Sequence, residues 1–188
     1  EGESIDSLIS LARRSGLRVL AGDHLTLVTD RPARAGDGVE DLPAVFDAGW
    51  SAWCDHYGLD AQEHHGWRAF GCLIIDRERF RRAGLLPDAI SDFANGHCHA
   101  DRFWLADQSN PDYRRHLLLH EGVHAFTLTL RGLDTPTWYT EGIAEYLATH
   151  RLVLAGGAPA RLVEPGDHRP SDYDLFFRSE EHTSELQS

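Results

Sequence analysis

The chain has 188 residues, of which 41% are hydrophobic, and this is enough to form one globular domain with a buried core. Its formal net charge of −12 argues against nucleic acid as a partner, because phosphate groups are bound by basic surfaces. No apolar run approaches the roughly 20 residues that a transmembrane helix needs, and no signal-peptide pattern opens the sequence. We therefore expect no membrane span in this fragment, and the compartment and oligomeric state stay open.

Hydrophobic periodicity and turn residues predict an α+β fold in which helices back a small sheet. In chain order, the expected elements are a helix at residues 4–15, a strand pair at 17–20 and 25–29, a helix at 39–57, a central strand at 68–75, an exposed helix at 76–82 and a last strand at 101–106. Asn95-Gly96 marks a turn before the last strand. We expect the sheet to be mostly antiparallel, with four or five strands.

Two consecutive helices are predicted after this last strand. The first has Asn110 as its N-cap and runs to Arg131. The second opens with Thr135 as its cap and Pro136 in its first turn, and it should continue to about Arg151. The loop between them is short, so the two helices are expected to pack as a hairpin.

The first helix of this hairpin carries the HExxH motif His120-Glu121-Gly122-Val123-His124. Residues four apart lie on one helix face, about 5–6 Å from each other, so His120 and His124 can offer two imidazoles to one metal ion. Zinc accepts such a pair. Glu121 lies close enough to take a proton from a water molecule on that metal, which is the position of a general base.

A catalytic zinc site typically uses three protein ligands, so one more donor is expected on the second helix. Glu141 is the best candidate. Glu145 lies one turn later on the same face, where it could accept the free N–H of a ligand imidazole and fix its tautomer; a solvated helix charge is the alternative. His116 extends the imidazole row by a turn, but the sequence places no glutamate to serve it, so we leave it out of the ligand set.

These residues resemble the HExxH metallopeptidases with a glutamate as third ligand, the gluzincins of the peptidase MA clan. The similarity is to an uncharacterised bacterial branch in which HExxH is followed by Pro-x-Trp-x-x-Glu-Gly-x-Ala-Glu-Tyr, the pattern of residues 136–146. The resemblance implies Zn²⁺ bound by His120, His124 and Glu141, and hydrolysis of a peptide or protein substrate with Glu121 as the catalytic residue.

The resemblance also implies a zincin-like fold in which the strand at residues 101–106 lies at the sheet edge, beside the cleft. An extended peptide could pair with such an edge as an added strand, and a purely structural strand is the alternative. A rival from another functional class is a non-catalytic module that zinc stabilises and that only binds peptide. A helix pair without any metal is the third alternative.

The remaining histidines and cysteines give weaker signals. His97 and His99 would face the same side of a strand, so a second metal is conceivable, but no carboxylate or thiolate partner is fixed by spacing. Cys54, Cys72 and Cys98 are too few and too irregular for a disulfide framework or a cysteine zinc site. We expect them to be small buried residues.

Residues 178–188 match a translated sequencing-library adapter in frame, and we treat them as non-biological. A genuine acidic tail is the alternative. We assign residues 1–177 to a single zincin-like metallopeptidase domain that is incomplete at its C-terminus, in a chain that is truncated at both ends. The residue that would stabilise an oxyanion is not identified by the sequence.

Overall fold

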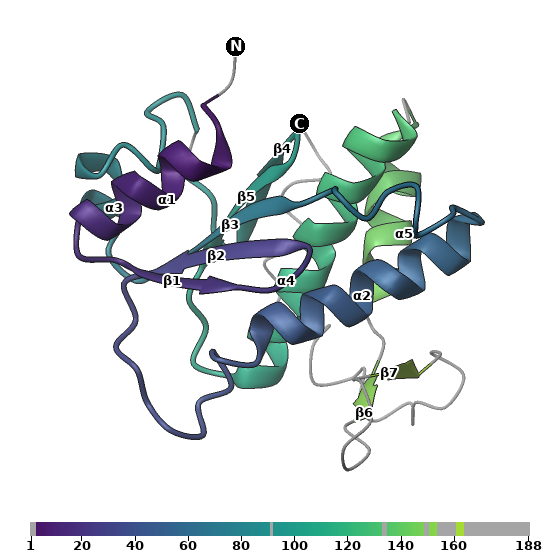
Figure 1. Cartoon of the computed structure of the whole chain (residues 1–188), viewed down its shortest axis with the longest axis horizontal. Helices are drawn as coiled ribbons and strands as arrows, with labels where there is room; N and C mark the ends of the chain where they lie inside the picture. Colours follow the sequence, from purple (N-terminus) through teal and green to yellow (C-terminus); the bar gives the residue numbers. More distant parts are fainter. Residues whose placement is uncertain (1–2, 91, 133–134, 149–150, 154–160, 164–188) are drawn as a thin grey trace.

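The computed structural model describes residues 3–90, 92–132, 135–148, 151–153 and 161–163, and Figure 1 shows their arrangement. The elements before the predicted metal helix are α1 (Ile5–Arg14), β1 (Arg18–Ala21), β2 (Leu25–Thr29), α2 (Leu42–Tyr57), β3 (Ala69–Ile74), α3 (Arg77–Arg82), β4 (Gly96–His99) and β5 (Arg102–Ala106). They are followed by α4 (Pro111–Phe126), the π-helix η1 (Thr127–Arg131), α5 (Thr137–Ala148), β6 (Arg151–Val153) and β7 (Arg161–Val163). The predicted adapter segment lies outside the described residues.

Five strands form one mixed sheet in the order β1-β2-β3-β5-β4. The outer pairs, β1 with β2 and β4 with β5, are antiparallel, whereas β2–β3 and β3–β5 are parallel. Parallel neighbours need a crossover connection, and α2 supplies one between β2 and β3 (Figure 1). The predicted α+β class is confirmed, as are the strand pair β1–β2 and the central position of β3.

The prediction that the strand before the metal helix lies at the sheet edge was wrong. That strand is β5, which is flanked by β3 and β4, and the edge strand is β4. Phe103, Trp104 and Leu105 of β5 are all buried, as expected for a strand covered on both faces. A turn was expected at Asn95-Gly96, but Gly96 begins the short strand β4. This strand was missed because its sequence, Gly-His-Cys-His, has no hydrophobic alternation.

Side chains of β3 alternate between two hydrophobic cores, one on each face of the sheet. Phe70 and Cys72 point to the core that α1 and α3 cover. Ala69 and Leu73 point to the larger core, which the sheet forms with α2, α4 and α5. Figure 1 shows these helices on opposite sides of the sheet. Helix α4 is thus packed on one face of the sheet and contributes to the larger core.

The ends of the two hairpin helices follow local sequence signals only in part. The Asn110 side chain caps α4 by accepting from the N–H groups of Asp112 and Tyr113 at 2.8 and 3.3 Å, and the helical stretch ends at Arg131 as predicted, although its last residues form a π-helix. The second helix was predicted to reach about Arg151, but Arg151 begins β6.

No helix of the described part of the chain is both long and apolar enough to cross a lipid bilayer.

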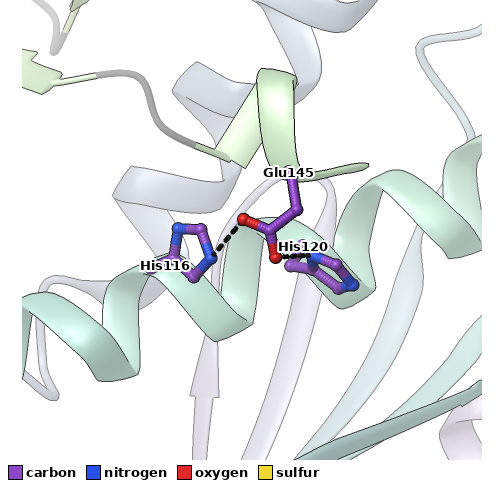
Figure 2. A group of neighbouring side chains, drawn as sticks. All are labelled: His116, His120 and Glu145. Carbon is purple, nitrogen blue, oxygen red and sulfur yellow. Dashed lines mark ion pairs between the residues drawn. The ribbon is translucent and has the colours of Figure 1, made fainter. Parts of the chain in front are cut away.

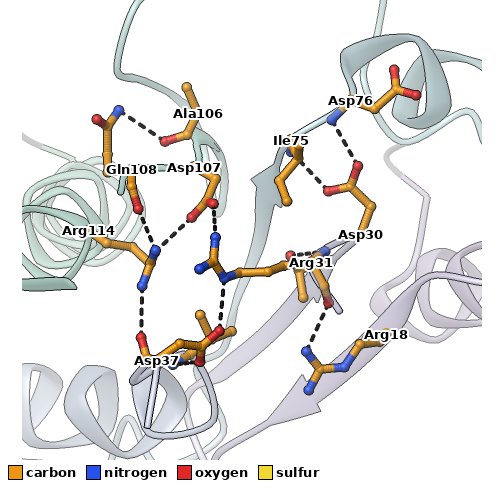
Figure 3. Close-up of polar contacts among 12 residues, drawn as sticks. Arg18, Asp30, Arg31, Asp37, Ile75, Asp76, Ala106, Asp107, Gln108 and Arg114 are labelled. Carbon is orange, nitrogen blue, oxygen red and sulfur yellow. Dashed lines mark hydrogen bonds and ion pairs between the residues drawn. The ribbon is translucent and has the colours of Figure 1, made fainter. Parts of the chain in front are cut away.

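An ion-pair network centred on the buried Arg114 connects the first turns of α4 to the loops beside the sheet (Figure 3). Arg114 has a side chain only 2% exposed, and it donates to Asp107 Oδ1 at 2.7 Å, to the carbonyl of Asp37 at 2.9 Å and to the carbonyl of Gln108. Arg31 pairs with both Asp37 and Asp107, and its guanidinium lowers the pKa of the Asp37 carboxyl. The carboxylates of Asp37 and Asp107 and the carbonyls of Asp37 and Gln108 thus accept from two guanidinium groups. These charge-assisted contacts hold the start of α4 in place.

Candidate metal centre

Helix α4 presents three histidines in a row along one face, because His116, His120 and His124 are spaced by four residues. Helix α5 packs along α4 and presents Glu141 and Glu145 to this row with the same spacing. The opposite face of α4 lies in the larger core. Helical periodicity on two packed helices therefore brings imidazoles and carboxylates together.

The three predicted ligands meet at one point. His120 Nε2 lies 3.1 Å from His124 Nε2 and 3.2 Å from Glu141 Oε2, and His124 Nε2 lies 3.5 Å from Glu141 Oε1. A tetrahedral ion with bonds of about 2.0–2.1 Å separates its ligand atoms by about 3.3–3.4 Å. The observed spacings lie near this value, with the two glutamate distances made by different carboxylate oxygens, so the donor set could hold a zinc-sized cation. Imidazole and carboxylate donors are also accepted by copper, iron and nickel.

The charges of this cluster are strongly coupled. Burial opposes protonation of His120, but the carboxylates of Glu141 and Glu145 outweigh it and raise the pKa of the imidazole to about 10. Hydrogen bonding to His120 and His124 lowers the pKa of Glu141 well below its ordinary value. A single positive charge is thus strongly favoured at this point of the molecule, in a chain that is acidic as a whole.

Glu121 is nearly buried, with 7% of its surface exposed, and it faces the edge strand. Burial raises the pKa of its carboxyl, while the neighbouring His120 and His124 act in the opposite direction. A Cβ atom at Gly96 would lie only 2.3 Å from Glu121 Oε1. The carboxylate therefore occupies space that exists because β4 begins with glycine, a role that the sequence alone did not reveal.

Glu145 lies between two imidazoles, as Figure 2 shows. Its Oε1 is 3.2 Å from His120 Nδ1, which is the contact predicted for it, and its Oε2 is 3.2 Å from His116 Nε2. The interpretation that no glutamate serves His116 was wrong. It failed because the partner is 29 positions away in the sequence and reaches His116 only through the packing of α5 on α4.

The cluster opens into a cleft of about 670 Å³, a size typical of ligand sites. Its walls are the edge strand β4, the metal helix α4 and the start of α5. Leu128, from the π-helix, also lines it. The cleft therefore gives a ligand access to the histidines and to Glu121 from the side of the sheet edge.

The other histidines and cysteines do not join the cluster. Within the described residues, His97 and His99 belong to no group of ligand atoms close enough to share an ion. The His97 ring instead lies near the rings of Phe93 and Trp104, and burial lowers its pKa. All three cysteines are free thiols, and Cys54 and Cys72 are buried as predicted, whereas Cys98 is partly exposed.

Comparison of the chain with protein-family models, with curated proteins and with solved structures finds no match. The resemblance to gluzincins therefore depends on the motif residues alone. The structure supports a coarser statement: the described residues contain His and Glu groups placed so that they could hold a metal ion.

Proposed function

We propose that this protein is a zinc metallopeptidase that hydrolyses peptide bonds. The observation that carries the proposal is the convergence of His120, His124 and Glu141 at separations of 3.1–3.5 Å, with the buried carboxylate of Glu121 beside them. If the HExxH sequence were accidental, there would be no reason for a carboxylate from a second helix, that of Glu141, to contact both of its histidines. The geometry thus adds an independent reason for a metal to the motif itself.

Each residue has a distinct part in the proposed reaction. His120, His124 and Glu141 would hold the zinc, which when bound supplies Lewis acidity toward water and the scissile carbonyl. Glu121 would accept a proton from the attacking water and deliver it to the leaving amine. Its partly desolvated carboxyl suits this task, because a base that must also act as an acid works best with a raised pKa.

The edge strand β4 offers a means to orient the substrate. It pairs with β5 on one side only, and it lines the cleft through Gly96, His97 and Cys98. An extended peptide can add to such an edge through backbone hydrogen bonds. Since Gly96 contacts Glu121, a peptide bound there would lie next to the general base.

The rival function, a zinc-stabilised module that binds peptide without cleaving it, makes a different prediction for Glu121→Gln. Cleavage of a mixed peptide library, followed by mass spectrometry, should be lost in this variant while zinc measured by elemental analysis is retained. Glu63→Gln, at an exposed glutamate of a loop, is the matched control. Equal cleavage by Glu121→Gln and the unchanged chain would reject the enzyme proposal. Peptide binding without cleavage by the zinc-loaded chain would favour the rival.

A further inference from the structure

We propose that His116 is a positioning residue for the metal site, acting on the ligand His120 through Glu145. The inference rests on the proposed function, since it takes His120 as a zinc ligand. It assigns a role to a histidine outside the HExxH motif and outside the ligand set. The three side chains form a chain of contacts from α4 to α5 and back to α4 (Figure 2).

The contacts divide the two oxygens of one carboxylate between two imidazoles. Oε2 of Glu145 lies 3.2 Å from His116 Nε2, and Oε1 lies 3.2 Å from His120 Nδ1. The carboxylate therefore spans one turn of α4. With only one of these contacts, the carboxylate would be free to rotate about its last side-chain bond. With both made as hydrogen bonds, its plane would be fixed relative to the His120 ring.

Burial makes this arrangement matter energetically. His120 Nδ1 and Glu145 Oε2 are both shielded from solvent, and neither has a well-aligned hydrogen bond, although each lies 3.2 Å from its partner. Buried polar atoms need partners, because solvent cannot replace them. A small rotation of the rings would align N–H donors of His116 and His120 with the two carboxylate oxygens. The pairing then satisfies both buried atoms.

The consequence for the metal concerns the tautomer of His120. When Glu145 accepts the Nδ1–H of His120, the proton is kept on Nδ1 and the lone pair of Nε2 is left for the ion. His120 Nε2 is the atom that faces His124 and Glu141. His116 thus supports metal binding without touching the ion, by keeping Glu145 in the orientation that His120 requires.

The same three residues could be taken for a second metal site, because their ligand atoms lie within 4.8 Å of one another. The contacts argue against this. The two imidazoles of the first site lie close together, with ring centroids 4.8 Å apart, whereas the rings of His116 and His120 are 6.1 Å apart. Binding a second ion would also require His120 to lose both ring protons. We therefore assign Glu145 as an acceptor shared by two donors.

The test measures zinc affinity by competition with a chromophoric chelator for a pair of amide variants. The terminal nitrogen of Gln lies at about the reach of His Nε2, so His116→Gln should keep the affinity, whereas His116→Asn, one methylene shorter, should lower it about tenfold. Glu145→Ala should lower it by about tenfold or more. His65→Ala, at an exposed histidine, is the control.

A double-mutant cycle separates positioning from general stability. If His116 acts through Glu145, then His116→Asn should cause no further loss of zinc affinity in a Glu145→Ala background. Additive losses, or equal affinities of the Asn variant and the unchanged chain, would overturn the inference while leaving the proposed function intact. A second zinc equivalent that disappears with His116→Asn would also overturn it. Absence of zinc binding by the unchanged chain would instead reject both proposals.

Discussion

Gly122 lies between His120 and His124 of α4, with its Cα facing aromatic rings of α2. A Cβ atom added there would lie 2.6 Å from Phe46 Cε2 and 2.7 Å from Trp53 Cη2. Both rings are fully buried, so they cannot move aside into solvent. Gly142, on α5 next to Glu141, differs in this respect, because a Cβ at that position meets no atom within 4 Å.

The same substitution should therefore have opposite effects on the two helices. Carbon atoms pack best at about 3.5–4.0 Å, so Gly122→Ala forces a displacement of about 1 Å in a dense core, at a cost of about 1–3 kcal/mol. The gain in helix propensity recovers only about 0.5–1 kcal/mol. We expect Gly122→Ala to destabilise the fold by a net of about 1–2 kcal/mol. Gly142→Ala should stabilise it by about 0.5–1 kcal/mol.

Urea unfolding of the metal-free protein, followed by tryptophan fluorescence, measures both changes without any need for activity. Partial rescue is also expected: Phe46→Leu should cost less stability in the Gly122→Ala background than alone, because the smaller side chain relieves the overlap. A Gly122→Ala variant as stable as Gly142→Ala would refute the claim that glycine is needed for the close approach of α4 to α2.

Three further predictions concern the site and its support. Gly96→Ala places a Cβ atom 2.3 Å from Glu121 Oε1, so we expect peptide cleavage to fall about 100-fold with zinc retained; an unchanged rate would contradict the proposed contact. Zinc binding near neutral pH should release about one proton, because His120, with a pKa of about 10, must lose it to become a ligand. The apparent zinc affinity should therefore rise with pH below that value, and calorimetry in buffers of different ionisation enthalpy measures the release; no proton release would show that His120 is already neutral. Arg114→Met removes a buried guanidinium, one of the two that pair with the partly buried Asp107, so urea unfolding should show a loss of about 3 kcal/mol. A loss below about 1 kcal/mol would show that Arg31 alone suffices.

Local signals in the sequence were sufficient for most elements of the fold. Asn110 followed by proline fixed the start of the metal helix, because a side-chain acceptor and a residue without an N–H satisfy the needs of a helix N-terminus. Spacing within helices placed the ligands on common faces, so the meeting of His120 and His124 with Glu141 followed once the two helices were assumed to pack. The helix start and the shared helix faces depend on interactions within a few residues, and only the packing of the two helices had to be assumed.

The features that the sequence did not predict are set by packing between distant segments. β4 has neither alternation nor β-branched residues, and it is a strand because β5 beside it offers an antiparallel partner. The contact of Gly96 with Glu121 depends on the distance between a strand and a helix. The contact of His116 with Glu145 depends on the position of α5 along the axis of α4. No periodicity within one segment encodes such offsets.

The third alternative, a helix pair without a metal, must explain the convergence of three ligand atoms. In a metal-free protein the cluster would be held by a proton on His120, which the raised pKa of this imidazole favours. A proton on His120 Nε2 is shared chiefly with one acceptor, yet both His124 Nε2, at 3.1 Å, and Glu141 Oε2, at 3.2 Å, lie near this atom, and Glu141 Oε1 lies 3.5 Å from His124 Nε2. A divalent cation carries twice the charge and accepts several lone pairs at once. These three side chains could therefore hold a metal ion, and zinc uptake by the unchanged chain, absent from His124→Ala, is the measurement that decides between a metal ion and a proton.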